Sequence, residues 1–299
     1  MQKVSSFLTS RKVAPFVFLA PFIILLVVFK IYPIILAVIL SFTNALGVQP
    51  NKWVGVGLNN YANLLRNTRF QGSLGVTTLY TICILVVLVP IPLVLAVLLD
   101  SGRVVKSTVF RVLLFLPGLT SLVVVGTLFR IILGDQGLFN GALQTLFGLP
   151  AQRWLEVSEL TIPSLVILAT WRWTGINILY FNSGLVNIPR ELYEAASIDG
   201  ANAFQLFLKI TLPLLRPITF FVVVLTVIGG FQVFVEPFIL YTAGNTPGDS
   251  GLSVALFIYQ TFTSFHLGLS AAMGVILALI ICVVSLVQFR FFGGFGREA

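Results

Sequence analysis

The chain alternates between long apolar runs without charge and short polar connections. The runs that contain no Asp, Glu, Lys, Arg or His are Val13–Phe29, Ile31–Asn51, Phe70–Leu99, Val112–Phe129, Trp173–Pro189, Pro217–Val235 and Leu267–Phe289. A helix that crosses a membrane needs about 20 mostly apolar residues. We therefore predict six membrane-spanning helices, at about 14–40, 74–99, 109–132, 161–186, 212–240 and 268–291.

The composition supports this interpretation. Of the 299 residues, 58% are hydrophobic and 9% are charged, whereas a soluble domain carries about 25% charged residues. Lipid cannot satisfy backbone polar groups, so separate spans must be helical. The predicted fold class is all-α, a polytopic membrane protein. We expect a tail at 1–13, one bundle at 14–295 and a second tail at 296–299.

Lys and Arg predict the orientation of the bundle. Eleven of the 18 basic residues fall on one side of the predicted spans, four on the other, and three within or at the ends of spans. Because basic residues collect on the cytoplasmic side, both termini and the connection after the fourth span should face the cytoplasm. A nucleic-acid site would need clustered Lys and Arg with aromatic platforms. No such cluster is visible, so we expect no nucleic-acid partner.

The polar connection between the fourth and fifth spans predicts two short helices. Pro189 can open the first helix, and Gly200 can take a positive φ between them. Asn202 followed by Gln205 is the signature of a capping box at the start of the second helix. These residues alone leave two interpretations: an amphipathic connector at the headgroups, or a surface on which another protein docks.

The same connection contains a distinctive order of residues. It reads Glu194-Ala195-Ala196, then Asp199-Gly200-Ala201, then Phe207, Ile210, Leu212-Pro213 and Pro217. This order resembles the EAA loop of ABC importer permeases, and most closely the carbohydrate branch with its maltose-type and glycerol-phosphate-type members. Trp171, Gly175 and the run from Thr242 also resemble that branch. The likeness covers about residues 70–295.

The resemblance implies the type I ABC importer permease fold, with residues 190–217 as the coupling loop. Its ATPase-coupling residues would be Glu194, Ala195, Ala196, Asp199, Gly200, Ala201 and Phe207. Glu194 would contact the ATPase, and Asp199 with Gly200 would form the turn between the short helices. The sequence contains no GxxxxGK phosphate loop, so this chain would not hydrolyse ATP itself. The resemblance implies a transport subunit that is not an enzyme. It would bind no cofactor, and a partner ATPase would bind ATP and Mg.

The resemblance also implies the partners and the location. We expect a second homologous permease, two ATPase subunits or a homodimer of one, an extracytoplasmic solute-binding protein, and membrane lipid. The location would be the cytoplasmic (inner) membrane of a prokaryote. The cargo would be a sugar, with a di- or oligosaccharide preferred and glycerol phosphate as the alternative. A stand-alone secondary transporter and a membrane enzyme are the rival functions.

Two sets of residues could line a substrate path. Trp173, Asn177 and Tyr180 are spaced i, i+4, i+7 and share one helix face. Gln232 and Glu236 are spaced i, i+4 beside two glycines. Aromatic faces can stack on the C–H side of a sugar ring, and amides can bind paired hydroxyls. The alternative is an interfacial aromatic belt with polar contacts between helices.

Arg172 keeps the phosphate alternative open, because phosphate favours arginine. Glu236 could instead pair with Arg172 across the bundle. The sequence shows no metal cluster, nucleophile triad or pair of catalytic carboxylates, so we predict no catalytic and no metal-ligating residue.

Overall fold

The computed structural model describes residues 14–47, 53–101 and 106–292. Within these ranges the regular elements are helices, and the strand-like pairings are the isolated bridges Thr43–Gly55 and Leu46–His266. The predicted tails at 1–13 and 296–299 lie outside the described residues. The chain divides into two compact units, residues 1–66 with 258–276 and residues 67–257 with 277–299.

The first unit begins with an apolar rod. It consists of α2 (Ala14–Leu26), the π-helical turn η1 (Val27–Ile31) and α3 (Tyr32–Ser41), followed by α4 (Asn59–Arg66). The Ser41 hydroxyl lies 2.6 Å from the Tyr61 hydroxyl, and Asn60 Nδ2 donates to the carbonyl of Ser41 at 2.8 Å. These bonds fix α4 at the end of the rod. The rod covers the predicted first span.

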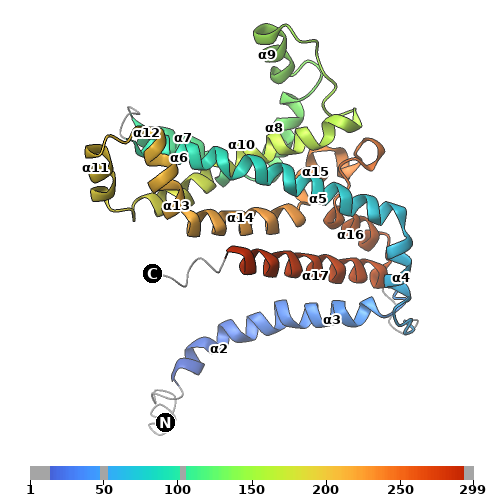
Figure 1. Cartoon of the computed structure of the whole chain (residues 1–299). Coiled ribbons are helices and arrows are strands. Elements are labelled where there is room, and N and C mark those ends of the chain that lie inside the picture. Colours follow the sequence, from blue (N-terminus) through green and yellow to red (C-terminus); the bar gives the residue numbers. More distant parts are fainter. Residues whose placement is uncertain (1–13, 48–52, 102–105, 293–299) are drawn as a thin grey trace, which may run out of the picture. The chain divides into compact units, whose positions relative to one another are not determined.

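The second unit is built around one long helix. α10 (Ser158–Leu185) packs against α5 (Thr68–Leu88), α6 (Pro90–Asp100) and α14 (Arg216–Phe231) (Figure 1). α5 and α6 run on as one 33-residue helix. Leu165, Leu168 and Ala169 of α10 are at most 2% exposed and form a core with residues of α5, α8 (Leu122–Ile132) and α15 (Val235–Leu240). The predicted second and fourth spans correspond to α5–α6 and α10.

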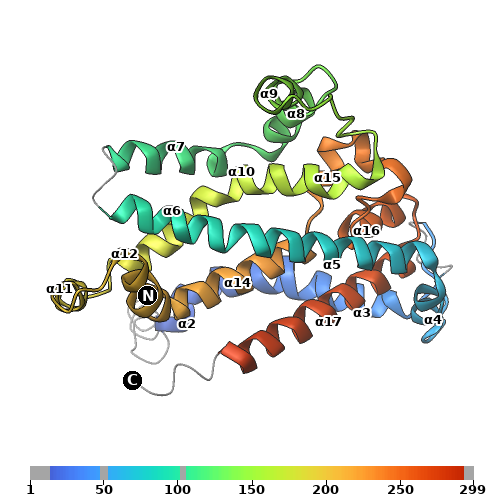
Figure 2. The same ribbon diagram turned by 45° about the horizontal axis from the view of Figure 1, so that its top comes forward.

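The prediction of one helix at 109–132 is wrong. α7 (Ser107–Leu119) and α8 (Leu122–Ile132) meet at 102°. Figure 2 shows α8 leaving the line of α7 and leading into α9 (Leu138–Phe147). Thr120 and Ser121 between them have extended backbone angles, with ψ of 143° and 133°. Pro117 and Gly118 weaken the preceding turn, because proline lacks an N–H and glycine favours the unfolded chain.

The predicted fifth span at 212–240 is also broken. The polar connection forms α11 (Arg190–Ile198), α12 (Ala203–Leu206), the π-helical turn η3 (Phe207–Thr211) and α13 (Leu212–Leu214), which bends by 68° into α14. α14 ends at Phe231, and α15 (Val235–Leu240) begins after a short break. The chain ends with the 3₁₀ turns η4 (Thr242–Gly244) and η5 (Pro247–Asp249), α16 (Val254–Thr263) and α17 (Leu267–Phe292).

Three described helices are long and apolar enough to cross a membrane, or five if each bent pair counts as one span. They are Phe18–Ser41, Thr68–Asp100 and Leu267–Phe291, with α7–α8 and the α12–α14 region as the bent pairs. α10 has 28 residues, but the polar residues in its middle lower its mean hydropathy. The total of six spans therefore stays a prediction.

Candidate functional site

A cavity of about 160 Å³ lies among α5, α10, α14 and the start of α15. We call it the mid-span cavity. Trp173, Asn177, Tyr180 and Glu236 line it, as four of the five residues predicted for a substrate path. The fifth, Gln232, is exposed and is not among the lining residues. The first three share one face of α10, as their spacing predicts.

Asn177 has a structural partner at this cavity. Its Nδ2 donates to the carbonyl oxygen of Leu88 at 2.9 Å, in a buried setting. In an unbroken α-helix that carbonyl would accept from the N–H four residues later. Residue 92 is a proline and has no N–H, so the carbonyl needs another donor. Asn177 supplies this donor from α10 and fixes the position of the proline-containing helix.

Arg172, the neighbour of Trp173, binds the backbone at a second helix interruption, between α7 and α8. Its Nη1 donates to the carbonyl oxygen of Thr120 at 2.7 Å, at the bend between α7 and α8. Its guanidinium lies 5.2 Å from the centre of the Trp173 ring. Arg172 and Glu236 interact electrostatically without forming a direct ion pair, and the Trp173 side chain hydrogen-bonds the Glu236 carboxylate. The expected Arg172–Glu236 pairing is thus indirect.

The lining of the mid-span cavity suits a neutral, hydroxyl-bearing ligand. Tyr80, Trp173 and Tyr180 supply aromatic surface, and Asn177 keeps its amide oxygen as an acceptor. Glu236 adds a carboxylate. No Lys or Arg is among the described residues that line the cavity, and Arg172 is committed to the backbone of the α7–α8 bend. A phosphate group would therefore meet the Glu236 carboxyl group without a lysine or arginine among the described lining residues to bind it.

The polar connection forms the predicted pair of short helices, which we call the α11–α12 hairpin. Asn202 accepts from the Gln205 backbone N–H and its own N–H donates to the Gln205 side chain, both at 2.9 Å, so the capping box is confirmed. Gly200 has a φ of +81°, as the turn requires. In Figure 1 the hairpin lies at the end of α10 remote from α15.

The hairpin is exposed and carries apolar residues on its surface. None of the residues of α11 is buried. Ile198 is 87% exposed and Phe204 is 69% exposed. One tether to the bundle is a hydrogen bond of 3.0 Å between the hydroxyls of Tyr193 and Thr211. A surface of this kind is typical of a docking site, because large apolar side chains gain by leaving water.

The seven predicted coupling residues occupy different surroundings. Glu194, Ala195, Asp199 and Gly200 are exposed, and Ala196 and Ala201 are half-buried. Phe207 is half-buried and packs against the core between α6, α10 and the hairpin, where Tyr193 also packs. The geometry thus separates a group that faces outward from Phe207, which anchors the hairpin to the bundle.

Sequence reasoning missed a cluster at the other end of α10. The Arg69 side chain donates to both carboxylate oxygens of Asp249, at 2.7 and 3.1 Å, and lies 5.0 Å from the centre of the Phe257 ring. The Ser158 hydroxyl donates to the Pro247 carbonyl at 3.0 Å. These contacts tie the loop after α15 to the first turns of α5 and α10. Partners 180 residues apart leave no local pattern in a sequence.

The described residues contain no group of three or more His, Cys, Asp or Glu side chains that could hold a metal ion. The broken helices, the mid-span cavity and the exposed hairpin are features of a protein that moves a solute or a signal across a membrane. Comparison with known proteins shows to which family the chain belongs. The family described as "Binding-protein-dependent transport system inner membrane component" matches residues 77–293.

The chain belongs to this family. Among its relatives, the arabinooligosaccharides transport system permease protein AraP of Bacillus subtilis is 44% identical over 292 residues, covering 97% of this chain and 91% of that protein. The sn-glycerol-3-phosphate transport system permease protein UgpA of Agrobacterium fabrum is 33% identical over 292 residues, covering 94% of this chain and 95% of that protein. The resemblance to the carbohydrate branch of ABC importer permeases is confirmed.

A solved structure shares the fold of this inner membrane component. A chain of a bacterial ABC transporter involved in the import of the acidic polysaccharide alginate superposes with a TM-score of 0.84. The match covers 99% of this chain and 100% of that chain, at 22% sequence identity. The predicted permease fold is thereby shown, and the family is one of transport components.

Proposed function

We propose that this chain is a membrane-spanning permease subunit of an ATP-driven importer for a neutral di- or oligosaccharide. The observation that carries the proposal is the α11–α12 hairpin, whose capped turns hold an exposed surface of acidic and apolar residues at one end of the bundle. The matching order of residues in the coupling loop of related permeases and the relationship to AraP support it.

In this proposal the chain works in an assembly in the inner membrane of a prokaryote. Its six spans leave both termini and the hairpin in the cytoplasm. A second homologous permease completes the pathway, and two ATPase subunits, or a homodimer of one, bind ATP and Mg. A solute-binding protein delivers the sugar from outside. This chain itself binds no nucleotide and catalyses no reaction.

The hairpin would transmit the movement of the ATPase to the bundle. Glu194, Ala195, Asp199 and Gly200 face outward and would contact the ATPase. Phe207 packs against the bundle, so a displacement of the hairpin would be passed on to α10 and α14. Two states that bind the ATPase differently would then shift the population between outward-open and inward-open forms.

The cargo is argued from the mid-span cavity. Three aromatic rings, an amide oxygen and one carboxylate suit the hydroxyls and C–H faces of a sugar. Glycerol phosphate, which UgpA transports according to its name, would bring a negative charge beside Glu236. No Lys or Arg among the described residues that line the cavity would offset that charge. We therefore favour a neutral saccharide for this chain.

The test is uptake by the complete transporter in sealed proteoliposomes, with the solute-binding protein outside and ATP inside. We expect ATP-dependent uptake of radiolabelled arabino-oligosaccharide that persists when an ionophore collapses ion gradients. Glycerol 3-phosphate should neither enter nor compete. Uptake that survives ATP depletion and stops with the ionophore would favour a secondary transporter. Uptake of glycerol 3-phosphate in place of the sugar would overturn the cargo assignment alone.

A further inference from the structure

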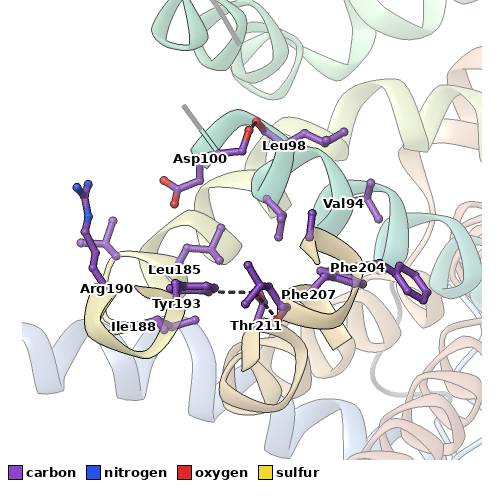
Figure 3. Close-up of a pocket in the computed structure, with 15 residues that line it drawn as sticks. Val94, Leu98, Asp100, Leu185, Ile188, Arg190, Tyr193, Phe204, Phe207 and Thr211 are labelled. Atoms are coloured by element: carbon purple, nitrogen blue, oxygen red, sulfur yellow. Dashed lines mark hydrogen bonds between the residues drawn. The ribbon is translucent and has the colours of Figure 1, made fainter. Parts of the chain in front are cut away.

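A second and larger cavity, of about 940 Å³, lies where α6 and α10 end (Figure 3). We call it the helix-end cavity. Its volume is at the upper end of the range of about 300–1,000 Å³ that is usual for ligand sites. Its walls come from α6, α10, α11, α12 and η3. They are mainly aliphatic and aromatic, with Val94, Val97, Leu98, Leu185, Leu206 and Phe207 as examples.

The helix-end cavity is separate from the proposed sugar path. The two cavities share no lining residue. Leu88 of the α5–α6 helix faces the mid-span cavity, whereas Val94 and Leu98 face the helix-end cavity. At about 100° per residue, these two positions lie about 240° and 280° round the helix from Leu88. An occupant of the helix-end cavity would therefore not stand in the way of the sugar.

The cavity lies at the level where a membrane span ends. Its α6 wall runs from Val94 to Ser101, and the apolar run of this helix stops at Asp100. Val94 and Leu98 are 45% and 52% exposed, so the wall continues into the lipid-facing surface of the helix. The cavity therefore opens between acyl chains and headgroups. In the orientation proposed above, on which this inference rests, those headgroups belong to the cytoplasmic leaflet.

The charges at the rim are unequal. Asp100 and Arg190 both line the cavity and lie on one side of it in Figure 3. Asp100 is paired with Arg111 at 3.4 Å, whereas Arg190 forms no ion pair within the described ranges. At the floor of the cavity, the Tyr193 and Thr211 hydroxyls form a hydrogen bond with each other. The cavity is thus mainly apolar inside, and Arg190 at its rim has no ion-pair partner within the described ranges. A ligand with an acyl chain and an anionic head group fits this arrangement.

We propose that the helix-end cavity binds an anionic phospholipid of the cytoplasmic leaflet. An acyl chain lies between α6 and η3, and the phosphate lies beside Arg190. Basic pockets between helices at the cytoplasmic side are a known form of lipid recognition. Since α11, α12 and η3 supply one wall, the bound lipid braces the α11–α12 hairpin against the bundle. Lipid composition would then tune how firmly the hairpin transmits the movement of the ATPase.

The experiment uses the complete transporter in nanodiscs of phosphatidylcholine with a trace of a phospholipid that carries a photoreactive group on its acyl chain. The probe is phosphatidylglycerol in one sample and phosphatidylcholine in the other, and labelled peptides are mapped by mass spectrometry. We expect peptides of α6 and of α12–η3 to be labelled by the phosphatidylglycerol probe about fivefold more than by the phosphatidylcholine probe, which is the preference that one basic residue near the surface provides.

Two variants and one matched control decide whether the label reports this cavity. Leu98→Trp fills the chamber and Arg190→Gln removes the rim cation, so each should lower labelling by about fivefold. Ile91→Trp is the control, because Ile91 is also an exposed residue of α6, at 43%, but does not line the cavity. Its labelling should match that of the unmodified protein.

Equal labelling by both probes, or equal labelling in Leu98→Trp and Ile91→Trp, would overturn the proposal. ATP-dependent sugar uptake is measured with the same purified transporter after reconstitution into sealed proteoliposomes of the same lipids. Loss of specific labelling with normal uptake refutes the lipid site alone, whereas normal labelling without uptake refutes the transport function alone.

Discussion

Around the mid-span cavity, polar side chains bind the backbone of the protein itself, whereas on the α11–α12 hairpin apolar side chains face outward. Asn177 and Arg172 each satisfy a carbonyl at a helix break, and both are buried. Ile198 and Phe204 are 87% and 69% exposed. The side chains of Asn177 and Arg172 in the first region find backbone partners within this chain, whereas the exposed apolar side chains of the second region would be covered only in an assembly. Mutations in the first should change stability, and mutations in the second should change association.

The largest effect is expected where α7 crosses α10. Gly175 lies so close to α7 that a Cβ atom would stand 1.9 Å from the Leu114 carbonyl oxygen. Backbone must move to admit it, so Gly175→Ala should lower the free energy of unfolding by about 3 kcal/mol. Thermal unfolding in detergent would measure the loss. Gly75→Ala is the matched control, because nothing lies within 4 Å of its Cβ position. Equal melting temperatures for both variants would show that this crossing is not tight.

The next effect concerns the bond from Asn177 to the Leu88 carbonyl. Asn177→Leu leaves that buried acceptor without a donor and should lower the free energy of unfolding by about 2 kcal/mol. Pro92→Ala restores an N–H four residues after Leu88, so the helix can satisfy the carbonyl itself. In the Pro92→Ala background, Asn177→Leu should therefore cost less than about 1 kcal/mol.

The double-mutant cycle makes this prediction specific. If Asn177→Leu were equally harmful with and without Pro92, its role would not be to replace the missing N–H. In that case Asn177 would act mainly on the ligand, and sugar uptake would fall in both backgrounds alike. A loss of uptake with unchanged stability would also assign Asn177 to the ligand rather than to the helix break.

The two regions also differ in how well the sequence predicted them. The hairpin was predictable because its determinants are local: Gly200 permits the turn, and Asn202 with Gln205 caps the second helix. The face of Trp173, Asn177 and Tyr180 followed from helical spacing. The partner of Asn177 was hidden, although Pro92 in the sequence marks a carbonyl that needs a donor. The 102° bend at Thr120 was missed because an apolar run predicts burial in lipid and contains no information on direction.

Association should respond to the exposed face of the hairpin. Glu194→Lys reverses a charge that the proposed function places against the ATPase, and it should weaken binding of the ATPase about tenfold, or about 1.4 kcal/mol. The melting temperature of the isolated chain should not change, because Glu194 is exposed. The measurement is the amount of ATPase that co-purifies as the concentration of detergent-solubilised complex is lowered.

Glu159→Lys is the matched control for this charge reversal. Glu159 is also an exposed glutamate, but it lies in the first turn of α10, at the opposite end of that helix from the hairpin. It should leave co-purification unchanged. If both variants lost the ATPase to the same degree, the effect would come from net charge, and the hairpin would not be the docking surface.

The smallest effect is expected at the Arg69–Asp249 pair. This pair is exposed, as the hairpin is, but both of its partners belong to this chain, as do the backbone partners of Asn177 and Arg172. Its side chains are 46% and 47% exposed, so water and salt weaken the attraction. Asp249→Asn keeps a residue that tolerates the positive φ of +58° at this position. It should therefore lower the free energy of unfolding by less than about 1 kcal/mol, and the difference should shrink further at high salt.

Glu156→Gln in the local Arg153–Glu156 pair, whose side chains are 65% and 53% exposed, should change stability still less, because this pair joins no distant segments. If the loop after α15 depends on the Arg69–Asp249 pair, Asp249→Asn should instead cause a loss of unfolding free energy well above about 1 kcal/mol that persists at high salt. An exposed ion pair would then stabilise the fold as much as the buried hydrogen bonds around the mid-span cavity do.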